Sequence, residues 1–129
     1  MAKILYVENE SDIAELVRRW LEEDDEHQVL LAADGAKGLK VAFDQHPDLI
    51  LLDLDLGAFS DDGWTVNRRL KADARTARIP VVALTAHAQF KEHRERAIAE
   101  GFIAHLSKPL DYDRFTAEIR RLTSPGATP

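Results

Sequence analysis

Short apolar runs alternate with longer, more polar stretches along most of the chain. Five runs have the length and composition of buried strands, and they cover residues 3–7, 28–33, 48–52, 79–85 and 102–106. Each is followed by a stretch of helical spacing or composition, at residues 13–21, 36–43, 64–74, 87–100 and 112–122. Because strands and helices alternate without interruption, we predict an α/β fold with helices on both faces of a parallel sheet and right-handed crossovers.

Composition restricts the classes of function. The 129 residues suit one domain, which we expect to span residues 1–123, followed by a mobile tail at 124–129. A formal net charge of −6 argues against a nucleic-acid or membrane binder. The chain has no cysteine, which excludes disulfides and thiolate chemistry and is compatible with the cytoplasmic location that we expect. No apolar run has the length of a signal peptide or a membrane span.

Residues that could form a site stand where four of the five predicted strands end, and each of these strands supplies at least one polar side chain. They are Glu8 and Asn9 after the first strand, Asp53 and Asp55 after the third, Thr85 and Ala86 after the fourth, and Lys108 and Pro109 after the fifth. Alone, each could be an ordinary strand-end or surface residue. Because sites in doubly wound sheets form beyond the carboxyl ends of the strands, we expect these side chains to share one site.

The chemistry of this set is that of phosphoryl transfer. Carboxylates from two strands can hold Mg²⁺, which takes one or two carboxylates together with waters and phosphate oxygens. A hydroxyl and an ammonium group can bind phosphate oxygens. Asp53, at the centre, can attack phosphorus and form an aspartyl phosphate.

The motifs VENE, LLDLD, ALTA and SKPL, at these spacings, resemble the receiver domain of bacterial two-component response regulators. The resemblance implies a flavodoxin-like sheet with strand order 2-1-3-4-5. It implies that a histidine kinase or histidine phosphotransfer protein donates a phosphoryl group to Asp53. The domain would catalyse only its own phosphorylation and dephosphorylation, and would not be an enzyme with an independent substrate. Phosphorylation would reshape the surface of the fourth helix, fifth strand and fifth helix, where a downstream protein of unknown identity binds.

The resemblance also implies a metal site. Asp53 corresponds to the phosphoacceptor, and Glu8 and Asn9 correspond to the acidic pair that holds Mg²⁺ beside it. The backbone carbonyl of Asp55 corresponds to a further metal ligand.

Four other positions correspond to the phosphate-binding and switching groups of the family. Thr85 corresponds to the hydroxyl that moves toward the phosphate, and Lys108 to the lysine that pairs with it. The backbone N–H of Ala86 would contact the phosphate. Pro109 follows a peptide bond that is expected to be cis.

Three positions depart from the pattern of the family. Asn9 stands where an aspartate is usual, and it is either a neutral helix cap or a weaker metal ligand that slows phosphorylation. The loop at residues 57–63 has Gly57 in place of a proline, and it looks about two residues longer than usual. His105 replaces the aromatic switch residue, and it is either a tolerated half-exposed side chain or a titratable form of that switch.

Other residues near the motifs have two interpretations each. His87 and Asp55 are solvated loop residues, or they tune the lifetime of the phosphoryl group. The run KEHRERAIAE is a solvated helix face, or part of a partner-binding surface with Phe90 as an exposed contact.

Two other functions compete with the phosphorylated receiver. A pseudo-receiver would use the same fold to bind partners without phosphorylation, which the Asn9 change favours and Asp53, Thr85 and Lys108 oppose. The sequence LDLDL also matches the Asp-x-Asp motif of haloacid-dehalogenase-type phosphatases, but it lies on the third strand and lacks a later acidic metal motif. No output domain follows the receiver, so we expect a stand-alone protein or a piece of a larger regulator, with homodimerisation possible.

Overall fold

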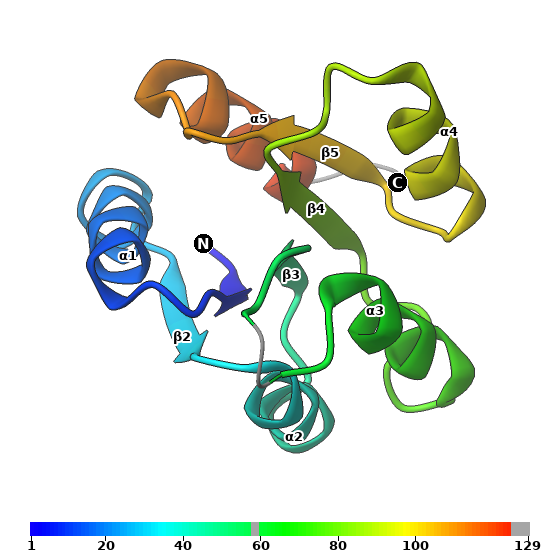
Figure 1. Ribbon diagram of the computed structural model, residues 1–129. Coiled ribbons are helices and arrows are strands. Elements are labelled where there is room, and N and C mark those ends of the chain that lie inside the picture. The colour runs from blue at the N-terminus through cyan, green and yellow to red at the C-terminus, as the bar shows by residue number, and fades with distance from the viewer. Residues whose placement is uncertain (58–59, 125–129) are drawn as a thin grey trace.

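The computed structural model describes residues 1–57 and 60–124, which form one sheet with a layer of helices on each face (Figure 1). The strands are β1 Lys3–Val7, β2 Gln28–Ala32, β3 Leu49–Asp53, β4 Val81–Thr85 and β5 Ala104–Ser107. The helices are α1 Ser11–Asp25, α2 Gly35–Gln45, α3 Gly63–Ala72, α4 Lys91–Ala99 and α5 Tyr112–Thr123. The tail predicted from residue 124 lies outside the described residues beyond Ser124, and so do residues 58–59 of the long loop.

The five strands are parallel and lie in the order β2-β1-β3-β4-β5. This confirms the α/β prediction and the strand order that the resemblance implied. The order reverses between β1 and β3, and these two neighbours end in Val7 and Asp53. Doubly wound sheets bind ligands at such a point, beyond the carboxyl ends of the strands.

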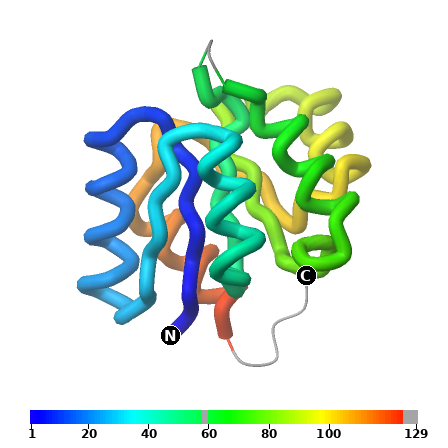
Figure 2. The backbone as a smooth tube through the Cα atoms, turned by 90° about the horizontal axis from the view of Figure 1, so that it is seen from below, coloured from blue at the N-terminus to red at the C-terminus, as the bar shows by residue number. Residues whose placement is uncertain are grey.

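Each face of the sheet has its own apolar core, and the central strands supply side chains to both by period-two alternation. On one face, residues such as Leu5 and Ile50 pack with α2, α3 and α4. On the other face, Ile4 and Leu51 pack with α1 and α5. Figure 2 shows α1 and α2 on either side of the first two strands. Because β3 and β4 are buried along their whole length, the side chains at their carboxyl ends begin from a rigid base.

Three elements begin two or more residues later than the sequence predicted, because their first predicted residues belong to turns and loops. Ile79 donates to the Thr76 carbonyl in a turn, so β4 begins at Val81 and not at residue 79. Phe102 donates to the Ala97 carbonyl at the end of α4, so β5 begins at Ala104. The predicted helix 87–100 begins only at Lys91, and residues 86–89 form a turn beside Thr85.

Side-chain caps define the start of three helices. Asp34, Asp62 and Asp111 each accept a hydrogen bond from the backbone N–H three residues later, at the N-termini of α2, α3 and α5. Asp111 therefore caps a helix, which agrees with the lack of a second acidic metal motif after β5. Within residues 1–57 and 60–124, no helix has both the length and the apolar character needed to cross a membrane.

Candidate functional site

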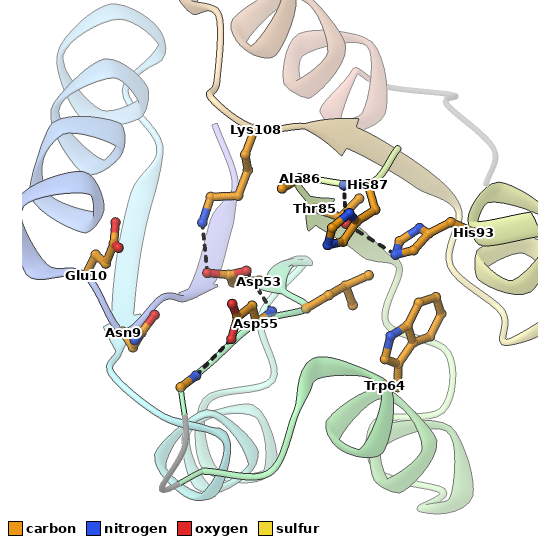
Figure 3. A pocket seen from close by; sticks show the side chains of 12 residues that line it. Asn9, Glu10, Asp53, Asp55, Trp64, Thr85, Ala86, His87, His93 and Lys108 are labelled. Atoms are coloured by element: carbon orange, nitrogen blue, oxygen red, sulfur yellow. Dashed lines mark hydrogen bonds and ion pairs between the residues drawn. The ribbon is translucent and has the colours of Figure 1, made fainter. Parts of the chain in front are cut away.

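A cavity of about 320 Å³ opens at the carboxyl edge of the sheet (Figure 3). Most of the residues predicted for the site line it: Asn9, Asp53, Asp55, Thr85, Ala86 and Lys108. Glu10 of the VENE motif and His87 also line it, and so do Trp64 and His93, which the sequence did not suggest. The structure therefore brings together the ends of β1, β3, β4 and β5.

Asp53 lies at the centre of a cluster of buried charges. Its side chain is 1% exposed, and Lys108 Nζ donates to its Oδ2 at 2.9 Å. The same ammonium donates to Glu8 Oε1 at 3.2 Å, so Lys108 bridges both carboxylates. The lysine comes from the loop after β5, and the Lys108–Pro109 peptide bond is cis.

Tyr6 on β1 contacts this cluster through Glu8, and sequence reasoning missed it. Its hydroxyl donates to Glu8 Oε1 at 2.9 Å, and its ring is fully buried. The Glu10 N–H donates to the other oxygen of Glu8, at 3.3 Å. Strand alternation could have found Tyr6, since residues two apart on a strand project from the same face. Glu8 is therefore held in place by contacts from its own strand and from the first turn beyond it.

Burial and mutual repulsion couple the two carboxylates. Burial, together with the neighbouring Glu8, raises the pKa of Asp53 to about 7. Burial also acts to raise the pKa of Glu8, but hydrogen bonding with Asp53 and the charge of Lys108 outweigh it and lower that pKa. Burial acts to lower the pKa of Lys108, but Asp53 and Glu8 outweigh it and raise that pKa. Asp53 is therefore partly protonated near neutral pH, and a bound cation would displace that proton.

The loop after β3 holds the Asp55 side chain by a hydrogen bond to its own backbone. The Asp55 N–H donates to Asp53 Oδ1 at 2.9 Å, while Asp55 Oδ1 accepts from the Gly57 N–H at 3.3 Å. Gly57 has a φ of +90°, a conformation that glycine tolerates and that the ring of proline forbids. A proline at position 57 could not adopt this φ, so the path of this loop excludes the proline that is usual there.

Asn9 does not cap a helix, and that interpretation is wrong. The N-cap position of α1 belongs to Glu10, which makes no side-chain capping bond. The reason is one of register: α1 begins at Ser11, so Asn9 precedes the cap by one residue. The Asn9 side chain instead borders the cavity, and a Cβ added to Gly57 would lie 3.2 Å from its Nδ2 atom.

The oxygen donors at the cavity suit Mg²⁺. At the cavity, Asp53 offers a carboxylate, Asn9 an amide oxygen and Asp55 a backbone carbonyl, and Mg²⁺ prefers such hard ligands. Glu8 does not line the cavity, but Lys108 joins its carboxylate to that of Asp53. Across residues 1–57 and 60–124, no group of three or more acidic or histidine side chains is placed to hold a metal ion. A cation here would therefore depend on the amide, the carbonyl and water as well as on the two carboxylates.

Thr85 ends β4 at the other side of the cavity. It is 3% exposed, and its Oγ1 accepts from the His87 N–H at 3.0 Å. His93 Nε2, from α4, lies 3.3 Å from the same oxygen. Sequence reasoning missed His93, and no periodicity or motif within the charge-rich α4 could have marked it.

His105 lies apart from the cavity that holds Asp53. It is half-buried on β5 and borders a second cavity of about 270 Å³, together with Pro109 and Phe115. Burial and the nearby Arg94 lower the pKa of His105. The structure therefore leaves both interpretations of His105 open.

Comparison with known families identifies the chain. Residues 4–120 match the model of the response regulator receiver domain. The chain belongs to this family. Its receiver domain is 33% identical over 120 residues to the polar-differentiation response regulator DivK of Brucella ovis, covering 93% of this chain and 95% of DivK. It is also 39% identical over 122 residues to the DNA-binding dual master transcriptional regulator RpaA of Synechocystis. That match covers 95% of this chain but only 49% of RpaA, so the receiver spans about half of that relative.

Solved receiver structures share the fold. The receiver domain of a Pseudomonas aeruginosa sensor histidine kinase, with a magnesium ion coordinated in its active-site cleft, has a TM-score of 0.79. It is 29% identical, covering 93% of this chain and 95% of that one. The chemotaxis protein CheY4 of Vibrio cholerae has a TM-score of 0.84 at 24% identity, covering 94% of this chain and 98% of that one.

Proposed function

We propose that this receiver accepts a phosphoryl group on Asp53, with Mg²⁺, from a histidine kinase or a histidine phosphotransfer protein. One observation carries the proposal: a buried carboxylate with a raised pKa borders an open cavity and contacts a lysine at 2.9 Å. A charged group so buried costs stability, and functional sites are where such costs concentrate. Phosphoryl acceptance and Mg²⁺ use are also general properties of receiver domains.

Each residue of the site has a separate role in the phosphoryl transfer. An oxygen of Asp53 attacks phosphorus, forming a P–O bond as the P–N bond to the donor histidine breaks. Lys108 then holds an oxygen of the transferred group, while Thr85 and the Ala86 N–H bind other oxygens. Mg²⁺, held by Glu8, Asn9, Asp53 and the Asp55 carbonyl, would neutralise charge on the phosphoryl oxygens. The protein mainly positions groups and compensates charge, as phosphoryl transfer requires.

The signal would leave through α4, β5 and α5. Phe90 and Ile98 are large apolar side chains at this surface, 52% and 70% exposed. We propose a protein partner there and a cytoplasmic location, in keeping with the net charge of −6 and with the kinase as phosphoryl donor. His87 and Asp55 line the cavity, which supports a role for them in the lifetime of the phosphoryl group.

Intact-protein mass spectrometry after incubation with acetyl phosphate tests this function, with and without Mg²⁺. We expect the wild-type protein to gain one phosphoryl group that depends on Mg²⁺, and the Asp53→Asn variant to gain none. Asn9 favours one competing function, a pseudo-receiver that binds partners without phosphorylation. No gain at high Mg²⁺, either from acetyl phosphate or from a histidine phosphotransfer protein, would support that alternative.

A further inference from the structure

The Thr85 hydroxyl is already engaged before any phosphoryl group is present. Its oxygen accepts from the His87 N–H at 3.0 Å and lies 3.3 Å from His93 Nε2. Figure 3 shows both contacts on the side of Thr85 that faces away from Lys108 and Asp53. Thr85 is therefore held by the α4 side of the cavity and not by the phosphorylation site.

The His93 ring is fixed by its surroundings. Trp64 packs against it at 5.2 Å between centroids, with the ring planes 63° apart, and the His87 ring lies 5.8 Å away. Within residues 1–57 and 60–124, His93 Nδ1 is buried and has no hydrogen-bond partner. The contact with Thr85 is therefore the hydrogen bond that the structure gives to this imidazole.

The direction of this hydrogen bond depends on which ring nitrogen of His93 carries the proton. Burial, together with the nearby His87, His105 and Arg96, lowers the pKa of His93 and favours the neutral ring. Nε2 of a neutral ring either accepts from the Thr85 hydroxyl or donates to its oxygen, which has a second lone pair beside the one that accepts from the His87 N–H. In either case the contact holds the Thr85 hydroxyl on the His93 side of the cavity.

The Thr85 hydroxyl occupies one position at a time. It cannot lie against His93 Nε2, on the side away from Asp53, and also contact a phosphoryl oxygen on Asp53. We propose that His93 is a positioning residue that holds Thr85 in the unphosphorylated arrangement, so that phosphorylation must first break the Thr85–His93 hydrogen bond. The inference rests on the proposed function, because it takes the phosphoryl group as the competing partner of Thr85.

His93 would also carry the state of the site to α4. When Thr85 turns toward the phosphoryl group, the His93 ring loses its hydrogen bond and keeps only its ring contacts, such as that with Trp64. Its position can then change. Because His93 belongs to α4, the same hydrogen bond links the chemistry at Asp53 to the helix that presents Ile98. The phosphoryl group would thus change the equilibrium between two states of α4 by differential contacts.

Binding of beryllofluoride, an analogue of the phosphoryl group, tests this role in the presence of Mg²⁺. The variant His93→Phe keeps an aromatic ring against Trp64 but removes the nitrogen that contacts Thr85. We expect it to bind beryllofluoride about fivefold more tightly, the value of one neutral hydrogen bond. Its affinity for Mg²⁺ alone should equal that of the wild type, which a general change in structure would not produce.

The variant Thr85→Val supplies the matched control, because it has no hydroxyl to release. In that background, His93→Phe should leave beryllofluoride affinity unchanged. An equal gain in both backgrounds, or no gain in either, would overturn the role of His93. Restoring a hydrogen-bonding side chain with His93→Gln, which can donate or accept, should return the affinity toward the wild-type value.

A second measurement keeps this inference separate from the proposed function. In the unphosphorylated protein, the ¹⁵N chemical shifts of the His93 ring should change when Thr85 becomes valine, because Nε2 loses its hydrogen-bond partner. Unchanged shifts would refute the hydrogen bond, whether or not Asp53 is phosphorylated. If the wild type gains no phosphoryl group and binds no beryllofluoride, the proposed function fails, and the shifts still decide whether the hydrogen bond exists.

Discussion

Removing the charge of Asp53 should stabilise the metal-free protein, in contrast to most substitutions of a buried residue. Burial and Glu8 raise the pKa of Asp53 from 3.8 to about 7. Between these values the folded protein keeps a proton that the unfolded chain releases. Stability from this group is therefore complete below about pH 4 and is lost as the pH rises through 7.

The size of the effect follows from the two pKa values. A rise from 3.8 to about 7 corresponds to roughly 4 kcal/mol, at about 1.4 kcal/mol per pKa unit. Most of this free energy, roughly 3 kcal/mol, should be lost between pH 5 and pH 8. The lowered pKa of Glu8 acts in the opposite direction, but mainly below its ordinary value of 4.5 and so outside this range.

Urea unfolding of the wild type and of Asp53→Asn, in EDTA at pH 5 and pH 8, measures the effect. The variant should gain stability relative to the wild type as the pH rises, by about 3 kcal/mol over this interval. Titrations of the histidines occur in both proteins and cancel in the difference. Adding Mg²⁺ should reduce the difference, because the cation replaces the proton in the wild type. A difference that does not change with pH would refute the raised pKa of Asp53.

Two further predictions concern the metal site and the backbone beneath it. Asn9→Asp should bind Mg²⁺ roughly tenfold more tightly than the wild type, because it adds a negative charge beside a divalent ion. Calorimetry measures this affinity, and Gln45→Glu, which adds the same charge at the far end of α2, is the control. Equal Mg²⁺ affinities of the two variants would contradict the prediction. Gly63→Ala should lower the urea midpoint by the equivalent of about 1–3 kcal/mol, because its Cβ would lie 2.5 Å from the Asp53 carbonyl oxygen. Gly38→Ala meets only Val7 side-chain atoms, the nearest at 2.8 Å, and should cost less; equal losses would contradict the special closeness at Gly63.

Much of the fold could be predicted from the sequence, because it depends on local pattern. Alternating apolar runs and helical stretches gave the order of elements, and the expected boundaries failed mainly in the turns around β4 and β5. Loop hydrogen bonds, such as that from Ile79 to the Thr76 carbonyl, set those limits, and no hydrophobic pattern reports them. The strand order came from the resemblance of the motifs, since periodicity does not say which strands are neighbours.

Most of the residues of the site could also be predicted from the sequence. Parallel strands bring their carboxyl ends to one edge, so residues that follow β1, β3, β4 and β5 must meet there. This reasoning placed Asp53, Thr85 and Lys108 beside the same cavity. It could not find His93, because α4 reaches the cavity through tertiary packing, against β5 and through the contact of His93 with Trp64 of α3.

The sequence by itself determined which segments are strands and helices and which polar residues stand at the strand ends, since both depend on residues near one another in the chain. Only the tertiary structure decided how those residues interact. It placed Lys108 between Glu8 and Asp53, and it set His93 against Thr85. Proton sharing and hydrogen-bond competition depend on distances of a few ångströms between residues remote in sequence, and these arise only when the sheet and its helices pack together.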